Sequence, residues 1–147
     1  MKIRILTFIV GSFILIQCAR NESFIELQND WIEVIETDTG YMTKSHVEYG
    51  MFLMRIIDQK KIQLMADDKV ENLIIEELNY SDNTYKIKCL SEMEDTMRQT
   101  ILIHRKTKES EIIEVTFLFD SENKDEIIMK CLFASAENAK TYPIFIW

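Results

Sequence analysis

Proline and glycine are scarce in this chain, which has one proline and three glycines in 147 residues. Such a composition argues against a long disordered region. The scarcity of glycine also leaves no glycine-rich loop that would cradle a phosphate and no Gly-x-Ser-x-Gly motif around a serine nucleophile. Enzyme classes that depend on either motif are therefore not indicated.

Histidine is also scarce, since His46 and His104 are the only two. His46 lies in a polar segment, and His104 lies on the polar face of its predicted strand, so we expect both in solvent. Zinc needs three or four converging ligands, and the chain contains no short-range cluster of histidine and cysteine. We expect no catalytic residue, no metal and no cofactor.

Two acidic turns are the remaining candidates for a metal site. They comprise Asp67, Asp68 and Glu71, and Asp120, Glu122 and Asp125. Neither has the ligand spacing and central glycine of a calcium loop. We interpret both as solvated turns.

Basic residues are outnumbered, with 17 lysines and arginines against 25 acidic residues and a net charge of −8. This balance disfavours binding to nucleic acid phosphate. An acidic surface can attract a basic protein, or it can simply keep the protein soluble. The charge alone does not choose between these two.

The N-terminus contains the longest apolar run. Lys2 and Arg4 precede an apolar stretch over residues 5–16, which is the order found in an export signal. The stretch is shorter than the roughly 20 residues that a membrane-spanning helix needs. We therefore predict a signal peptide over residues 1–17, with an uncleaved anchor as an alternative.

The end of this run, Leu15-Ile16-Gln17-Cys18, resembles the lipobox of bacterial lipoprotein precursors. The resemblance implies cleavage before Cys18 and lipidation of its thiol, with palmitate among the acyl chains, and stable attachment to a membrane follows from several chains. Ala19 in place of aspartate favours the outer membrane of the cell envelope. Residues 18–28 would be a lipidated start and a short tether, helical in part. Ordinary secretion is the alternative.

The rest of the chain alternates in the manner of β-strands. We predict strands over 29–36, 51–57, 62–64, 84–90, 97–105, 111–119 and 126–134, separated by polar turns. Residues 41–49 are an extended segment or a long loop, and 142–147 are a final strand or a plug. The segment 70–80 fits either a helix or a strand, because its apolar residues have partly helical spacing and its glutamates favour helix.

This pattern predicts a mainly β fold, an antiparallel meander that closes into a barrel or a strongly curled sheet. An open sandwich is the alternative. With Trp31 in Asn29-Asp30-Trp31, near the start of the first strand, the chain resembles small lipocalin-like domains of bacterial envelope lipoproteins, whose signature is Gly-x-Trp. The resemblance implies a lipocalin-like β domain over residues 29–147 with Trp31 closing the barrel floor.

Two cysteines follow Cys18, namely Cys89 and Cys131. In an oxidising compartment such a pair can close a disulfide if their strands are adjacent or facing. Both lie on the apolar face of their strands, so two buried thiols are the other interpretation.

Methionine and phenylalanine suggest where a ligand would bind. Met51, Phe52, Met54, Met65, Met93, Met97 and Met129 can line an adaptable apolar cavity or pack into a solid core. We accordingly predict a non-catalytic, lipid-anchored envelope protein that binds a small apolar ligand or lipid. The alternatives are an inhibitor or immunity lipoprotein that binds a basic protein, and an accessory subunit of an envelope complex.

Overall fold

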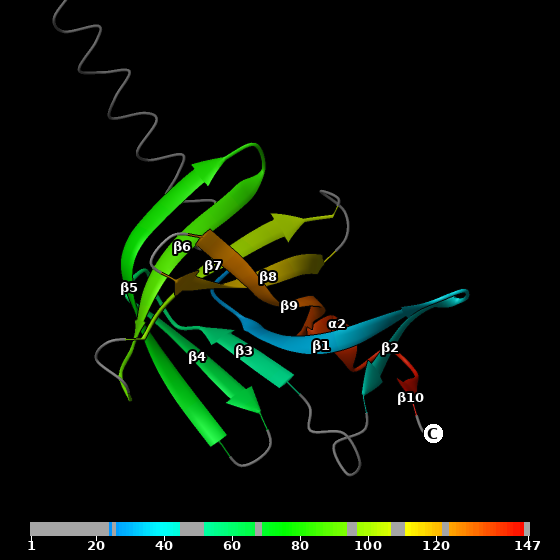
Figure 1. Ribbon diagram of the computed structural model, residues 1–147. Coiled ribbons are helices and arrows are strands. Elements are labelled where there is room, and N and C mark those ends of the chain that lie inside the picture. The colour runs from blue at the N-terminus through cyan, green and yellow to red at the C-terminus, as the bar shows by residue number, and fades with distance from the viewer. Residues whose placement is uncertain are drawn as a thin grey trace, which may run out of the picture.

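Ten strands and a short helix run through the residues described in the computed structural model, which are 24, 26–44, 52–66, 69–93, 97–106, 111–121 and 124–145. The strands are β1 (Asp30–Thr37), β2 (Gly40–Lys44), β3 (Phe52–Ile56), β4 (Lys61–Ala66), β5 (Lys69–Ser81), β6 (Thr84–Ser91), β7 (Arg98–Arg105), β8 (Ile112–Ser121), β9 (Lys124–Ser135) and β10 (Ile144–Phe145). The helix is α2 (Ala136–Ala139). Figure 1 shows the strands curling around a central axis.

The sheet closes through β1. This strand pairs with β3 on one side, where Trp31 faces Met54, and with β9 on the other, where Ile32 faces Ala134. The chain therefore forms a closed antiparallel barrel of eight strands, β1 and β3 to β9, with β2 and β10 outside it. The predicted mainly β fold and its closure into a barrel are confirmed. The alternative, an open sandwich, is wrong.

Polar turn residues set the hairpins. Asp82 and Asn83 both have positive φ, 50° and 60°, as a two-residue turn of the hairpin type requires. Asp58 accepts hydrogen bonds through Oδ1 from the backbone N–H of Lys60 (2.7 Å) and Lys61 (2.9 Å). These contacts fix the register of β5 with β6 and of β3 with β4.

The segment 70–80 is a strand, so the helical interpretation of it is wrong. The register of β5 against β6 shifts at a β-bulge between Ile75 and Glu77. Leu73 and Ile75 face inward before the bulge, and Leu78 and Tyr80 pack against the core after it. Because the bulge adds one residue, the inward set loses its strict alternation and acquires spacings that resemble a helix.

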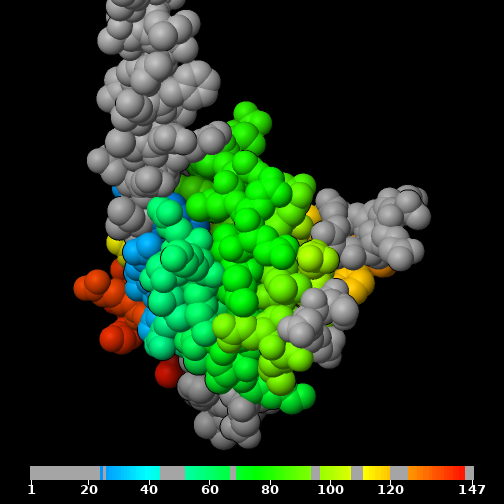
Figure 2. All heavy atoms as spheres, turned by 90° about the vertical axis from the view of Figure 1, so that its left-hand side faces the viewer, coloured from blue at the N-terminus to red at the C-terminus, as the bar shows by residue number. Residues whose placement is uncertain are grey.

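A second, smaller core covers the outside of the barrel where β1 meets β9. It contains Val34, Ile112, Ala134 and Ala139, with Tyr41 and Tyr142 against it. The space-filling view shows α2 beside β1 at the edge of the surface formed by β3 to β6 (Figure 2). Ser135 caps α2 by accepting a hydrogen bond from the Asn138 N–H.

The segments predicted only as alternatives lie beside this second core. Residues 41–44 of the predicted extended segment or loop belong to the strand β2, which Gly40 begins with φ 131°. In the C-terminal segment, Ile144 and Phe145 form the two-residue strand β10, parallel to β2. It is thus a short strand on the outside, and the interpretation as a plug of the barrel is wrong for Ile144 and Phe145.

One end of the barrel, called the floor here, is filled by Phe24, Leu27, Trp31 and Tyr85, all buried. The Trp31 indole Nε1 donates a hydrogen bond to the Leu27 carbonyl at 2.9 Å, and the Phe24 and Tyr85 rings meet edge to face at 5.8 Å. The predicted tether, residues 18–28, therefore contributes Phe24 and Leu27 to the core. No helix in the described part of the chain is long and apolar enough to cross a bilayer.

Candidate functional site

The opposite end of the barrel, called the mouth here, contains a cavity of about 840 Å³. It lies among the start of β3, β5, β7 and β9 and the end of β4, β6 and β8, together with Met93 and Met97 from between β6 and β7. Its lining consists of Phe52, Leu64, Ala66, Lys69, Val70, Glu71, Ser91, Met93, Met97, Gln99, Phe117, Ile128 and Met129. Ligand sites in proteins commonly have volumes of about 300 to 1,000 Å³, so this cavity has room for a small molecule.

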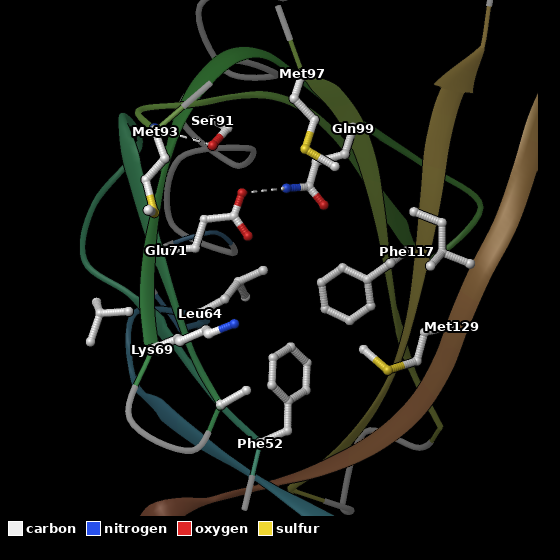
Figure 3. A pocket seen from close by; sticks show the side chains of 13 residues that line it. Phe52, Leu64, Lys69, Glu71, Ser91, Met93, Met97, Gln99, Phe117 and Met129 are labelled. Carbon is white, nitrogen blue, oxygen red and sulfur yellow. Dashed lines mark hydrogen bonds between the residues drawn. The ribbon is translucent and has the colours of Figure 1, made fainter. Parts of the chain in front are cut away.

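The wall formed by β3, β8 and β9 is apolar. Phe52 at the bottom of the cavity meets the rings of Phe117 and Phe133, each at 5.6 Å between centroids. Met129 lies beside Phe117 on the same wall (Figure 3). Aromatic rings fix the shape of this wall, whereas the flexible methionine can adapt to an irregular ligand.

The wall formed by β5, β6 and β7 carries the polar residues of the cavity. Lys69 and Glu71 occupy inward positions of β5, continuing the alternation from the buried Leu73, while Ser91 and Gln99 occupy inward positions of β6 and β7. Gln99 Nε2 donates a hydrogen bond to Glu71 Oε1 at 3.4 Å. Figure 3 shows Glu71 and Gln99 reaching toward each other across the upper cavity and the Lys69 ammonium pointing into it.

Burial differs along this polar wall. Gln99 is 7% exposed and Ser91 is 2% exposed, Glu71 is half-buried, and Lys69 is exposed. Ser91 Oγ accepts a hydrogen bond from the Met93 N–H at 3.2 Å. The amide and the hydroxyl are therefore fixed parts of the wall, and the lysine lies at its edge.

The rim of the mouth exposes several apolar side chains. Met93 is 76% exposed, Ile128 57% and Val70 49%. These residues also line the cavity, so its apolar surface continues to the outside. An apolar ligand that enters here meets little polar surface before it reaches the interior.

The methionine prediction is partly confirmed. Phe52, Met93, Met97 and Met129 line the cavity, but Met54 is fully buried in the core below it. Met65 follows the inward Leu64 and precedes the inward Ala66, so it faces outward. Met51 lies outside the described residues.

The sequence reasoning missed the polar wall. Glu71 was assigned to a solvated acidic turn, and Ser91 and Gln99 were not singled out. The signal that could have found it is the alternation of inward and outward residues along a strand. Ser91 continues the inward series of Ile87 and Cys89, and Gln99 begins the inward series of β7. A polar residue at an inward position of a barrel strand needs a partner or a ligand.

The two later cysteines are present as thiols and not as a disulfide. Cys89 is on β6 and Cys131 on β9, and β7 and β8 separate these strands in the sheet. Burial, with a smaller contribution from the charge of Glu76, raises the pKa of the Cys89 thiol to about 12. Such a thiol is a poor nucleophile at neutral pH.

The remaining predicted residues do not form a second centre. His104 is half-buried on the outside of β7, where its Nδ1 lies 3.1 Å from the Thr84 hydroxyl. Among the residues that the structure describes, no group of three or more His, Cys, Asp or Glu residues is placed to hold a metal ion. His46, Asp67, Asp68 and Cys18 lie outside the described residues.

A smaller hollow of about 230 Å³ lies at the floor, among Glu26, Arg105, Glu111 and Ser135. Four of its polar side chains are paired with one another. Arg105 forms an ion pair with Glu26 at 2.8 Å, and the Ser135 hydroxyl donates to Glu111 Oε2 at 2.9 Å. The mouth cavity is thus the better candidate for a ligand.

Comparison with known proteins supports the fold. No family model matches the chain, and no curated protein matches its sequence. Among solved structures, the chain is similar to pallilysin (Tp0751) of Treponema pallidum, with a TM-score of 0.54 and 11% identity over 74% of this chain and 77% of that one. At this identity the similarity concerns the fold alone.

Proposed function

We propose that this protein is a non-catalytic binding protein that holds a small lipid-like molecule in the mouth of its barrel. The observation that carries the proposal is the cavity of about 840 Å³, which has an aromatic and methionine wall and an apolar rim. An eight-stranded barrel has an interior that is either filled by side chains or just wide enough for one ligand. Here the floor is filled and the mouth is open.

The apolar wall supplies the main driving force in this proposal. Each methylene group that moves from water into the cavity contributes about 0.8 kcal/mol, which corresponds to about a fourfold gain in affinity. An alkyl chain lying between Phe52, Phe117 and Met129 would gain this contribution along its length. The polar wall would then receive the head group.

A series of n-alkyl alcohols tests this binding. We expect affinity, measured by displacement of an apolar fluorescent probe, to rise about fourfold per methylene until the cavity is full. Native mass spectrometry of the purified protein should also detect a co-purifying small molecule. If there is no uptake of any probe and no co-purifying molecule, the proposal is wrong.

The variant Ala66→Trp provides a second test, because Ala66 lines the cavity and a tryptophan would occupy it. We expect at least a tenfold loss of probe affinity, equivalent to about 1.4 kcal/mol. Met65→Trp is the matched control, since the neighbouring side chain faces outward. Equal loss in both variants would indicate general damage to the barrel and would count against the cavity as the site.

We also propose that the protein is attached to the cell envelope through a lipid on Cys18. Support comes from the lipobox-like residues 15–18. The buried Phe24 is six positions after Cys18, and a stretch of that length spans at most about 20 Å, so the floor would lie near the membrane and the mouth would face away from it. Cys18→Ala should abolish labelling by radioactive palmitate, and labelling that persists would show that Cys18 is not the site.

An inhibitor that binds a basic enzyme is the second candidate. The acidic composition is compatible with it, but this function requires no cavity. Pull-down from an envelope extract should recover a basic enzyme whose activity falls on binding if the second candidate is correct. The open cavity favours the lipid-binding function.

A further inference from the structure

We infer that the ligand is an amphiphile whose head group donates hydrogen bonds to Glu71, with a hydroxyl or an ammonium group in place of a carboxylate. This inference rests on the proposed function and specifies the chemistry of its ligand. It derives from three features of the mouth, namely the inward position of Glu71, the buried amide of Gln99 and the unequal depth of the two charges.

The first feature is the position of Glu71. The alternation of β5 directs Glu71 inward together with the fully buried Leu73, two residues further along the strand. A glutamate that only needed water would be accommodated at an outward position such as that of Glu77, which pairs with Lys88 on the surface at 2.8 Å. The inward position instead places a carboxylate in a largely apolar cavity.

The second feature is the hydrogen bond that this carboxylate accepts from Gln99 at 3.4 Å. Gln99 is buried and donates its amide N–H to Glu71 Oε1, which leaves Oε2 of Glu71 directed at the cavity (Figure 3). An ionised carboxylate only accepts hydrogen bonds. The group that meets Oε2 must therefore be a donor, and a second carboxylate there would be repelled.

The third feature is depth. Lys69 is one inward position closer to the rim than Glu71 and is exposed, and among the described residues no ion pair joins the two. The Lys69 ammonium points into the cavity from this exposed position (Figure 3) and can also turn to water on its long side chain, whereas Glu71 accepts a hydrogen bond from the buried Gln99. The head group would thus lie at Glu71, and the alkyl chain would extend down to Phe52 and Phe117.

Three amphiphiles with the same twelve-carbon chain test this inference: monododecanoyl glycerol, dodecylamine and dodecanoate. They are titrated by calorimetry below their critical micelle concentrations. A hydrogen bond to a charged group predicts that the glycerol or the amine compound, or both, bind at least about tenfold more tightly than dodecanoate. The glycerol compound alone would identify a hydroxyl head group, and the amine alone an ammonium.

Glu71→Gln should reduce this preference to less than about threefold, while Glu77→Gln on the outer face of the same strand should leave it unchanged. Glu71→Lys should reverse the preference in favour of dodecanoate, which loss of folding could not produce. If dodecanoate binds to the unmodified protein as tightly as the other two amphiphiles, the inference is wrong and the proposed function remains. If none of the three amphiphiles binds, and an uncharged apolar probe does not bind either, the proposed function itself is wrong.

Discussion

The floor and the mouth of this barrel are built from the same strands but differ in what fills them. At the floor, Phe24, Leu27 and Trp31 pack against Tyr85, and every one of these side chains is buried. At the mouth, the corresponding interior space is a cavity of about 840 Å³. Strand number is the same at both ends, so the barrel geometry alone does not decide whether its interior is solid.

The difference lies in the kind of residues that each end receives. The floor contains aromatic side chains together with Phe24 and Leu27, which precede the first strand. Trp31 donates a hydrogen bond to the Leu27 carbonyl and so ties Leu27 to the barrel. The mouth receives flexible methionines and four polar inward residues, which cannot pack into a dry interior without partners. One end therefore stabilises the fold, while the other leaves space for a ligand.

The largest expected effect is on the floor. Phe24→Ala should lower the free energy of unfolding by about 3–5 kcal/mol, because it removes a fully buried ring and leaves a cavity. Met97→Ala at the mouth is the matched change and should cost less than about 1 kcal/mol. Urea unfolding at equilibrium measures both values. Similar losses from the two variants would contradict the contrast between the two ends.

Cys89 marks the depth at which the solid interior begins. It faces Gln99 across β6 and β7 and is fully buried, which raises its pKa from 9.0 to about 12. The folded state keeps the thiol protonated, so its contribution to stability is complete below about pH 9 and is lost as pH rises from there toward about pH 12.

We therefore expect the stability difference between the unmodified protein and Cys89→Ala to fall by about 2 kcal/mol between about pH 8 and about pH 10.5. Urea unfolding at the two pH values gives the difference. The thiol should also react slowly with a thiol reagent in the folded protein. Rapid reaction at neutral pH would show that the cavity extends down to Cys89 and that the interior at this depth is not solid.

Much of the barrel could be predicted from alternation, since one face of most strands is apolar and the turns are polar. Glu76 shows why β5 was ambiguous, because a bulge at this residue shifts the inward series from Leu73 and Ile75 to Leu78 and Tyr80. A bulge depends on pairing with the neighbouring strand, which a local pattern does not contain. The helical and extended interpretations could not be separated for that reason.

The site was less predictable than the fold. Met93, Met97 and Met129 were expected near a ligand because of their adaptable side chains, and they line the cavity. Glu71 was read with Asp67 and Asp68 as part of a turn, since consecutive acids usually face water. Its inward direction and its contact with Gln99, 28 residues away, arise only when β5, β6 and β7 are assembled.

A smaller effect is expected at Trp31, whose role in closing the floor was implied by the resemblance to lipocalin-like domains. Trp31→Phe keeps an aromatic ring but removes the Nε1–H that donates to the Leu27 carbonyl. The buried carbonyl then lacks its partner, which should cost about 1–2 kcal/mol in the free energy of unfolding. The loss should be larger than that of Phe52→Leu at the bottom of the mouth cavity if the floor is the more rigid end. The opposite order would contradict that view.

The smallest effect concerns an ion pair on the outside of the floor. Arg55 Nη2 donates to Asp30 Oδ2 at 2.8 Å, and this hydrogen bonding lowers the pKa of Asp30 from its ordinary value of 3.8. The stabilisation is present above about pH 4 and is lost as pH falls through the lowered pKa. Because both side chains are more than a third exposed, at 36% and 44%, Asp30→Asn should cost less than about 1 kcal/mol at neutral pH. This cost should decrease as the pH falls below about 4 and shrink in 1 M salt. A loss as large as that of Phe24→Ala would mean that charges at its edge, rather than packed rings, hold the floor together.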